Sequence, residues 1–356
     1  MLPPLGNSRN VKISEEQIKD ALKAVKYPGF SRDIVSFGLV KSIDIDNGDL
    51  KVQLAIATND PNIPATIKSD AEKILANLAG VRSAKILIDI HAPPAGAGAT
   101  VGATRLPGVK HVIAVASGKG GVGKSTVAAN LAVAFEQTDA RVGLCDCDIY
   151  GPSISLMFGT RERPVATEDN KIVPIEQYNL KLMSMGFLLD DTSPAILRGP
   201  MVTRYTQQFL RQVDWGELDF LVLDLPPGTG DIQLTIVQTV ALSGAIIVTT
   251  PQEVALIDAR KAATMFEKVN VPVLGLIENM SHFVCPGDGK RYDIFGSGGG
   301  EREAKRLRVP LLGQIPIDIA TREAGDRGMP IVAEDRQSPV AQEFKKIAEH
   351  VRRELA

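Results

Sequence analysis

The sequence predicts an α/β protein with a mostly parallel sheet covered by helices on both faces, preceded by a small α-β-β-α-β domain. Three observations predict this fold. Strand-like and helix-like segments alternate over residues 109–356, several of the strands are unbroken apolar runs, and residues 1–91 form a shorter α/β pattern of their own. Alternating strands and helices indicate a parallel sheet, and a strand buried on both faces is apolar throughout.

The first domain, residues 1–91, begins with the sequence Ser14-Glu15-Glu16-Gln17, which fits a capping box at a helix start. Asp46-Asn47-Gly48-Asp49 is a strong hairpin signal. The remaining elements are expected as strands over residues 34–45 and 50–57, a helix over 67–78 and a strand over 85–90. The domain has no cysteine and one histidine, His91, which we expect at the surface, so no catalytic group is predicted in it.

Residues 92–108 separate the two domains and consist largely of Pro, Gly, Ala and Thr with one charge, Arg105. Such a composition predicts a flexible linker. A long surface loop within a single domain is the alternative, although loops of this length are uncommon.

The second domain, residues 109–356, is expected to contain seven strands, from their apolar runs. They are predicted over residues 112–116, 142–145, 181–185, 220–223, 245–249, 273–277 and 311–315.

A phosphate-binding loop is predicted at residues 118–126, Gly-Lys-Gly-Gly-Val-Gly-Lys-Ser-Thr. The segment follows an apolar strand and opens a helix, which is the setting that a P-loop requires. Backbone N–H groups and the helix N-terminus would bind phosphate, with Lys124 at the β- and γ-phosphates and the Ser125 hydroxyl at Mg²⁺. The predicted nucleotide ligands in the loop are Gly118, Lys119, Gly120, Gly121, Val122, Gly123, Lys124, Ser125 and Thr126.

Acidic residues are predicted at the ends of two further strands, where ligands of open α/β sheets gather. Phe220-Leu-Val-Leu-Asp224 has the form of a Walker B strand, so Asp224 is expected at Mg²⁺, and the Gly228 amide is expected to sense the γ-phosphate. Asp146 and Asp148, two apart on a strand, are expected to point the same way. Asp148 is the predicted residue that orients the attacking water. For Asp146, contact with Mg²⁺ and a role as a strand-end turn former are equally favoured.

The composition limits the partners. A net charge of −2, from 40 basic and 42 acidic residues, provides no global basic field, so neither nucleic acid nor a membrane is expected as a partner. Three cysteines, Cys145, Cys147 and Cys285, are too few for a disulfide scaffold. We expect a cytoplasmic protein, because the first residues lack a signal-peptide pattern and no run of about 18 apolar residues occurs.

These elements together resemble the Mrp/ApbC family of iron–sulfur carrier ATPases, within the MinD/ParA-like deviant Walker class. Residues 1–91 resemble the iron–sulfur-assembly-type domain fused to such proteins, notably over Asp33–Val40. In the second domain the likeness lies in the P-loop and in residues 148–153, 198–201, 224–231, 278–281, 294–300 and 313–318.

The resemblance implies an ATP-dependent homodimer that binds an iron–sulfur cluster and passes it to apoproteins alongside assembly factors. It implies that Lys119 reaches the partner's nucleotide, although an ordinary surface lysine is the alternative. It also implies that Asn279 and the backbone around Pro316 contact adenine. The amide of Asn279 offers the donor and acceptor that an adenine edge needs, with a structural turn residue as the rival interpretation.

One departure from the family pattern concerns the cluster ligands. Members of the family usually have Cys-x-x-Cys after the Glu-Asn-Met-Ser segment, but here Cys285 is followed by Asp288 at the second position. Cys285 is therefore the predicted cluster ligand, and Asp288 would be a harder, weaker donor. Cys145 and Cys147 are expected to pack in the interior.

Two other functions compete with a carrier. One is a cluster-free ATP-dependent assembly scaffold, which the Asp288 substitution favours. The other is a MinD/ParA-like positioning ATPase, which would need a membrane-binding helix. The apolar stripe of Phe344, Ile347, Val351 and Leu355 is short, so we expect the last helix to dock on the domain instead.

Overall fold

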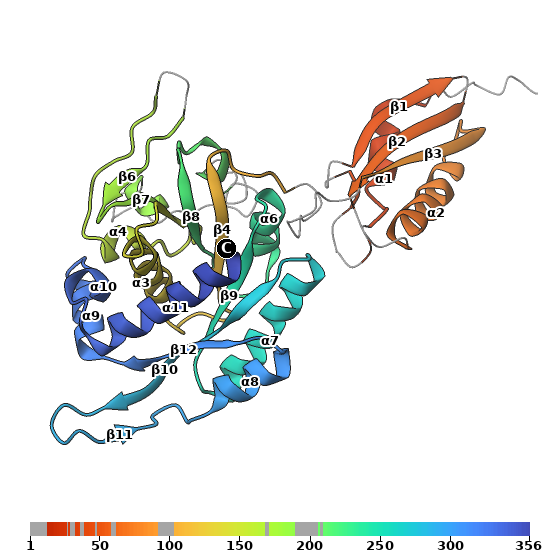
Figure 1. Ribbon diagram of the computed structural model, residues 1–356. Coiled ribbons are helices and arrows are strands. Elements are labelled where there is room, and N and C mark those ends of the chain that lie inside the picture. The colour runs from red at the N-terminus through yellow and green to blue at the C-terminus, as the bar shows by residue number, and fades with distance from the viewer. Residues whose placement is uncertain are drawn as a thin grey trace, which may run out of the picture. The chain divides into compact units, whose positions relative to one another are not determined.

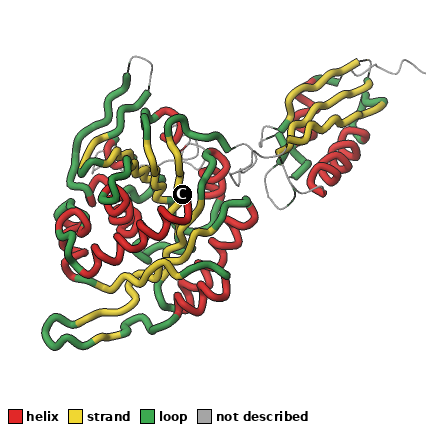
Figure 2. The backbone as a smooth tube through the Cα atoms, in the orientation of Figure 1, coloured by secondary structure: helices red, strands yellow, loops and turns green. Residues whose placement is uncertain are grey.

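The structure, a computed structural model, describes residues 13–26, 28, 33–35, 39–46, 48–57, 62–91, 103–167, 171–188, 206 and 209–356. It divides into two compact units, Met1–Gly96 and Ala97–Ala356. Figures 1 and 2 show both units, each with its own sheet and helices.

The first unit has the predicted α-β-β-α-β order. Its elements are α1 (Glu15–Leu22), β1 (Val40–Asp46), β2 (Asp49–Ala57), α2 (Asn62–Ala76) and β3 (Ser83–His91). The capping box at Ser14 and Gln17 is confirmed, since each side chain accepts a hydrogen bond from the other's backbone N–H. Strand β2 is central, antiparallel to β1 across the predicted hairpin and parallel to β3.

The predicted first strand is too long. Strand β1 begins at Val40, whereas Ile34 and Val35 lie in a turn and Asp33 forms an isolated bridge with Lys26. Ile34 is nevertheless fully buried. An apolar residue signals burial but does not distinguish a strand from a packed turn, which explains the error.

The predicted linker is only partly within the described residues, because residues 92–102 lie outside them. Its C-terminal part is attached to the second unit. Thr104 forms a parallel bridge with Val240, its N–H donates to the Thr239 carbonyl at 3.1 Å, and Leu106 is buried. Residues 104–106 are thus attached to the second unit by backbone pairing and burial, which does not depend on large side chains, and the flexibility of the linker stays a prediction.

The second unit is built on one large sheet. Its strands are β4 (Val109–Ala116), β5 (Val142–Asp146), β6 (Ile175–Gln177), β7 (Leu180–Met183), β8 (Leu218–Asp224), β9 (Gly244–Thr249), β10 (Val273–Val284), β11 (Arg291–Tyr292) and β12 (Leu311–Ile317). The strand order is β11-β10-β9-β4-β8-β5-β7-β6, with β12 also paired to β10. Pairing is parallel except between β6 and β7 and between β10 and β11.

Helices cover both faces of this sheet, as predicted. The helices are α3 (Lys124–Glu136), α4 (Ile154–Met157), the 3₁₀ turn η1 (Met185–Phe187), α6 (Asp231–Thr239), α7 (Glu253–Lys268), α8 (Gly299–Leu307), α9 (Ile319–Asp326), α10 (Ile331–Glu334) and α11 (Pro339–Leu355). In β9, Ile246 and Val248 belong to the core that contains α3, while Ile247 packs with Ala259 and Ala262 of α7. Alternate residues of one strand thus contact helices on opposite faces.

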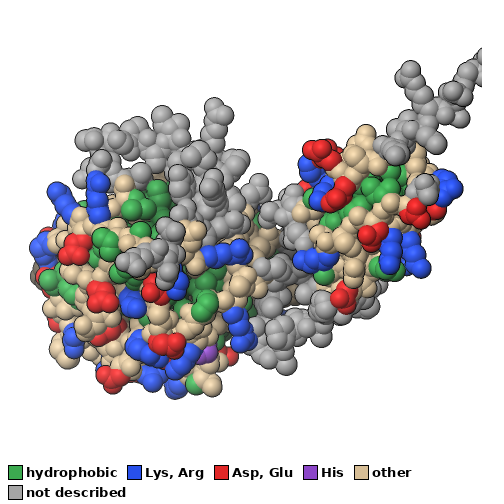
Figure 3. Space-filling view, turned by 90° about the horizontal axis from the view of Figure 1, so that it is seen from above, with side chains coloured by type: hydrophobic (Ala, Val, Ile, Leu, Met, Phe, Trp, Pro, Cys, Tyr) green, Lys and Arg blue, Asp and Glu red, His purple; other side chains and the backbone are tan. Residues whose placement is uncertain are grey.

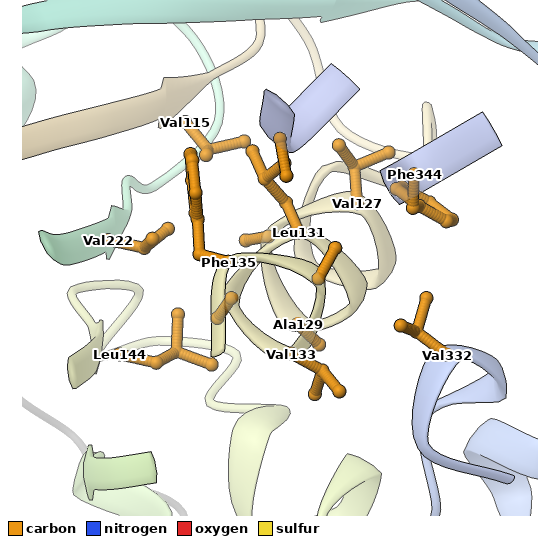
Figure 4. Packing of buried hydrophobic residues seen from close by; sticks show 14 of the residues in the cluster. Val115, Val127, Ala129, Leu131, Val133, Phe135, Leu144, Val222, Val332 and Phe344 are labelled. Carbon is orange, nitrogen blue, oxygen red and sulfur yellow. The ribbon is translucent and has the colours of Figure 1, made fainter. Parts of the chain in front are cut away.

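Helix α3 lies at the centre of the larger core. Its Leu131 and Phe135 point toward the sheet residues Val115 and Val222, and Phe344 of α11 lies beside Val127 (Figure 4). Phe344, Ile347 and Val351 of α11 are fully buried. The expectation that the last helix docks on its own domain is confirmed.

Candidate functional site

The phosphate loop joins β4 to α3 and is shaped by its glycines. Gly121 and Gly123 have φ angles of +79° and +78°, in the left-handed region that favours glycine. Within the described residues, no atom lies within 4 Å of where a Cβ of Gly120 or Gly121 would be. Helix α3 has no side-chain N-cap and no acidic residue in its first turn. Open space and uncapped N–H groups together make an anion site.

Two other glycines let neighbouring segments approach the loop. A Cβ on Gly118 would clash with the Asp258 carbonyl of α7, and one on Gly123 would clash with the side chain of Asn279. The Asn279 amide donates a 2.8 Å hydrogen bond to the Val122 carbonyl. The loop is therefore held from outside by α7 and β10.

Lys124, Ser125 and Asp224 come together at the loop. The Lys124 ammonium hydrogen-bonds one carboxylate oxygen of Asp224 and lies 3.3 Å from the Ser125 hydroxyl. Lys124 is 6% exposed and Asp224 is fully buried. Burial raises the pKa of Asp224, and the Lys124 charge opposes that rise.

The second carboxylate oxygen of Asp224 supports the predicted magnesium site. This buried atom has no hydrogen-bond partner within the described part of the chain. An unsatisfied buried carboxylate oxygen is costly unless a ligand completes it. Beside the Ser125 hydroxyl, it gives the oxygen donors that Mg²⁺ prefers.

Asp146 and Asp148 were expected to point the same way because both were assigned to one strand, but the observed strand is too short to include Asp148. Strand β5 ends at Asp146, so the alternation of side chains does not extend to Asp148. Asp146 is buried and accepts hydrogen bonds from the N–H groups of Asp148 (3.0 Å), Ser153 (3.0 Å) and Ile154 (3.3 Å). Asp146 is thus the residue that shapes the loop carrying Asp148, in line with the turn-forming role considered above.

Asp146 also carries a strongly shifted pKa. Burial, followed by the nearby charge of Asp224, raises the pKa of Asp146 to about 7, while its hydrogen bonds oppose the shift. One of these bonds comes from the Ser184 hydroxyl at 2.9 Å. Ser184 was not predicted as part of the site, because no local pattern links residue 184 to residue 146.

Three further predicted residues, Lys119, Asp148 and Gly228, come from three different loops of the second unit. Lys119 and Asp148 are half-buried, and Ser117 donates to the Lys119 carbonyl at 2.9 Å. The Gly228 N–H donates to the Ser117 carbonyl at 3.0 Å. Sensing of a γ-phosphate by that amide would require the bond to break.

Asn279 and Pro316 lie on adjacent parallel strands, since Asn279 of β10 is in register with Ile315 of β12. The sequence placed both near adenine, and their proximity agrees with a shared task. Contact with the base remains a prediction.

Glu278 was recognised only as part of a motif, but the structure gives it a position of its own. Its carboxylate is buried at the start of α8, where it accepts hydrogen bonds from the Gly300 N–H and, at 2.7 Å, from the Gln314 side chain. A carboxylate inside an apolar strand is a signal in the sequence that points to such a role. Glu278 joins β10, β12 and α8 beside Asn279.

Cys285 and Asp288 lie at the tip of a hairpin formed by β10 and β11. The Cys285 N–H donates to the Lys290 carbonyl at 2.9 Å, and the Gly289 N–H donates to the Cys285 carbonyl at 2.8 Å, which closes a tight turn. Cys285 is half-buried, and the Asp288 carboxylate accepts from the Lys290 N–H at 3.0 Å and the Tyr292 hydroxyl at 3.3 Å. Strand β10 thus leads from the phosphate loop to the predicted cluster ligand.

Cys145 and Cys147 are both buried, which confirms the expected packing role. Their sulfur atoms lie 3.9 Å apart. The neighbouring Cys145 and burial raise the pKa of the Cys147 thiol well above its usual value, so it stays protonated.

A search of the described helices finds none long and apolar enough to cross a membrane.

Comparison with known proteins places this site in a family. A family model described as NUBPL iron-transfer P-loop NTPase matches residues 108–352, and one described as iron-sulfur cluster assembly protein matches residues 15–88. A protein from Synechocystis named iron-sulfur cluster carrier protein is 42% identical over 344 residues, covering 95% of this chain and 97% of that protein. One of the same name from Deinococcus radiodurans is 45% identical over 332 residues, covering 92% of each.

A solved nucleotide-binding protein from Archaeoglobus fulgidus, in complex with ADP, is 39% identical with a TM-score of 0.59, over 67% of this chain and 93% of that one. The fold is that of a P-loop NTPase, and the predicted family is confirmed. The chain belongs to the NUBPL iron-transfer P-loop NTPases.

Proposed function

We propose that the protein is an ATPase that binds an iron–sulfur cluster as cargo and transfers it to apoproteins. The observation that carries this proposal is the β10 strand, which contacts the phosphate loop through Asn279 and ends at Val284, directly before Cys285. The two relatives described above carry the name iron-sulfur cluster carrier protein, which supports the same function. The proposed setting is the cytoplasm, with assembly factors and apoproteins as partners.

The nucleotide in this proposal is ATP with Mg²⁺. Ser125 and Asp224 would hold the metal ion, which neutralises charge on the transferred phosphate. Lys124 moves from Asp224 to the phosphates, and Asp148 orients the attacking water. Asn279 and the backbone of Pro316 bind the adenine edge.

The cargo site requires two chains. Within the described residues, no group of three or more His, Cys, Asp and Glu side chains is arranged to hold a metal ion. Protein-bound clusters commonly have four ligands, and a single hairpin tip offers only Cys285 and Asp288. A homodimer supplies two thiolates and two carboxylates. It also allows Lys119 to reach the partner's nucleotide.

Asp288 gives this carrier a distinctive donor. The Lys290 N–H is the main cause that lowers the pKa of Asp288, so the carboxylate is anionic and ready to bind a cation. Carboxylate oxygen is a harder and weaker ligand for cluster iron than thiolate. A labile cluster suits a donor that must release its cargo.

Anaerobic reconstitution with iron and sulfide tests the proposal. Wild type should show cluster absorbance and bind iron at one cluster per two chains. Cys285→Ala should bind none, and Asp288→Cys should retain iron longer than wild type against a chelator. Cys147→Ala is the matched control, because its buried, protonated thiol is not expected to ligate iron.

A cluster-free scaffold is the second candidate, which the aspartate at position 288 favours. In that case wild type retains little iron after reconstitution and Cys285→Ala changes nothing. Equal chelator resistance of wild type and Asp288→Cys would instead contradict the labile-donor argument.

A positioning ATPase on a membrane or on DNA is disfavoured by two observations. The apolar stripe of α11 is buried in the core and is not available to lipid. Basic and acidic side chains are interspersed on the face shown in Figure 3 rather than gathered into a basic field. We therefore propose neither nucleic acid nor a membrane as a partner.

A further inference from the structure

The loop that joins β8 to α6 is hydrogen-bonded to the end of β4 at two points. The Leu225 N–H donates to the Val115 carbonyl at 3.0 Å, and the Gly228 N–H donates to the Ser117 carbonyl at 3.0 Å. The two residues between these points are prolines, which have no N–H to donate and a fixed φ angle. The proline pair is therefore a stiff segment between two backbone contacts.

The side chain of Gln233 provides a third contact with this loop. Gln233 lies in the first turn of α6 and is 1% exposed. Its amide N–H donates to the Pro226 carbonyl. Its Oε1 atom is buried and has no hydrogen-bond partner in the parts of the chain that the structure describes. An unpaired buried amide oxygen costs free energy, so a donor that comes within its reach is stabilising.

The helix that carries this glutamine is fixed along its length. Ile236 is fully buried, and the last turn of α6 is bonded to the segment before β4. There the Thr104 N–H donates to the Thr239 carbonyl and the Ala241 N–H donates to the Thr104 carbonyl, both at 3.1 Å. The Pro226 carbonyl is thus tied to a well-packed helix.

Gly228 is the end of the loop that has room to move. Its φ angle is +97°, in the left-handed region that favours glycine, and no described atom lies within 4 Å of where its Cβ would be. To bind a γ-phosphate, the Gly228 amide must leave the Ser117 carbonyl. With the Pro226 carbonyl held by Gln233, that change turns the stiff proline pair about one fixed point.

We propose that Gln233 is a positioning residue for ATP hydrolysis, which holds the Pro226 carbonyl while the Gly228 amide moves from Ser117 to a γ-phosphate. The free Oε1 of Gln233 is an acceptor available to the loop in its new position. This inference rests on the proposed function. It predicts that Gln233 acts on nucleotides with three phosphates and leaves binding of those with two unchanged.

Two binding titrations and one rate measurement on the full chain test this role. Calorimetry gives the affinities for ADP and for β,γ-imido-ATP, each with Mg²⁺, and phosphate release gives kcat for ATP. Gln233→Met keeps the length of the side chain and removes its amide. It should leave the ADP affinity within twofold of wild type and weaken β,γ-imido-ATP binding about tenfold, as expected for loss of one buried hydrogen bond. It should also lower kcat about 10–100-fold, because the loop is misplaced.

Gln233→Asn is the second variant, because it keeps an amide that is one methylene too short to reach the Pro226 carbonyl. We expect the same difference between the two nucleotides. Thr239→Val is the matched control on the same helix. It removes a buried hydroxyl that donates to the Thr235 carbonyl at 2.7 Å, and it should leave both affinities and kcat within twofold of wild type.

Equal weakening of ADP and β,γ-imido-ATP binding in either Gln233 variant would show that this residue serves only the fold of the site, and would overturn the proposal. Wild-type kcat in Gln233→Met would overturn it as well. The two titrations need no turnover. Absence of hydrolysis by the wild-type chain would therefore contradict the proposed ATPase, while the ratio of the two affinities would still decide the role of Gln233.

Discussion

The two lysines of the phosphate loop differ in their surroundings. Lys124 is 6% exposed and contacts Asp224, whereas Lys119 is half-buried at the start of the loop, where its neighbour Gly118 lies against α7. Lys124 lies in its own chain's proposed nucleotide site, and we propose that Lys119 reaches the nucleotide of a second chain.

Substitution of each of the two lysines should therefore cause a different loss of nucleotide binding and hydrolysis. Lys124→Ala should remove both nucleotide binding and hydrolysis, because it deletes the charge at the phosphates. Lys119→Ala should lower kcat by roughly 10²–10³-fold, as for loss of one transition-state donor, with ADP affinity unchanged. Phosphate release and fluorescent-nucleotide titration measure the two effects.

Lys261→Ala on the nearby helix α7 is the control, since its side chain is 63% exposed. Normal turnover in Lys119→Ala would contradict a role for this lysine at a partner's nucleotide.

Asp219 allows a pH-dependent test of the stability of the second unit. Its carboxylate accepts from the Lys110 ammonium at 2.6 Å and the Arg141 N–H at 2.9 Å, and these partners, Lys110 first, hold its pKa far below the usual range. A depressed carboxylate pKa stabilises the fold above the unfolded pKa of about 4, and that stability is lost as the pH falls toward the folded pKa. Asp219→Asn should cost about 1–2 kcal/mol at pH 7.

The loss of unfolding free energy in Asp219→Asn, relative to wild type, should be as large at about pH 5 as at pH 7 and smaller at about pH 3.5. Urea unfolding followed by fluorescence of Trp215, the chain's single tryptophan, measures it in the second unit. If the difference in unfolding free energy between wild type and Asp219→Asn instead grows as the pH falls, the pKa of Asp219 is not lowered by folding.

For individual residues of the candidate site, the sequence indicates some structural roles and misses others. The loop glycines, Lys124 and Asp224 are predictable because each role depends on a contiguous motif beside a strand. The anchoring role of Asp146 depends on N–H groups seven and eight residues away and on Ser184, which follows strand β7 and caps η1. Those contacts exist only after the loop has folded.

Helices α7 and α8 show how elements are fixed around the site. Arg260 of α7 forms a two-point ion pair with Glu303 of α8, with both distances 2.7 Å, and Glu303 is 4% exposed. The Glu303 carboxylate is shielded from solvent, whereas the Arg260 side chain is 30% exposed. Removal of Glu303 therefore deletes two charge-assisted hydrogen bonds and leaves a guanidinium that water can partly reach.

Glu303→Ala should lower the free energy of unfolding by about 2 kcal/mol. Glu253→Ala is the matched control, because it breaks an exposed pair with Arg302 on the same two helices and should cost less than about 0.5 kcal/mol. Thermal unfolding of both variants compares them, and equal losses would show that burial does not strengthen the α7–α8 pair.

Strands and helices with several apolar positions were predictable, whereas short ones were not. Strand β6 has three residues and β11 has two, too few for any periodicity to appear. Both are antiparallel additions at the edges of a sheet that is otherwise parallel. Their pairing depends on the neighbouring strand rather than on their own sequence.

At the scale of the whole molecule, the proposed function depends on the number of chains in the assembled particle. We expect light scattering to show two chains per particle with ATP and Mg²⁺, because the described residues of one chain offer no full ligand set for a cluster and the proposed role of Lys119 involves a second chain. Lys119→Ala should dimerise more weakly under the same conditions. A monomer in every nucleotide state, at tens of micromolar, would rule out a bridging cluster.

Strand β10 connects the proposed nucleotide site to the proposed cluster ligand Cys285. Six residue steps separate Asn279 from Cys285, which at about 3.3 Å per residue is a reach of at most roughly 20 Å. Met280, next to Asn279, has a φ angle of +52°, so the regular strand conformation is interrupted directly after Asn279, where the pairing with β12 also shifts register. A small change in the backbone dihedral angles at Met280 would displace the tip of the β10–β11 hairpin. In the proposed carrier, nucleotide turnover would then control release of the cluster without any chemical group passing between the two sites.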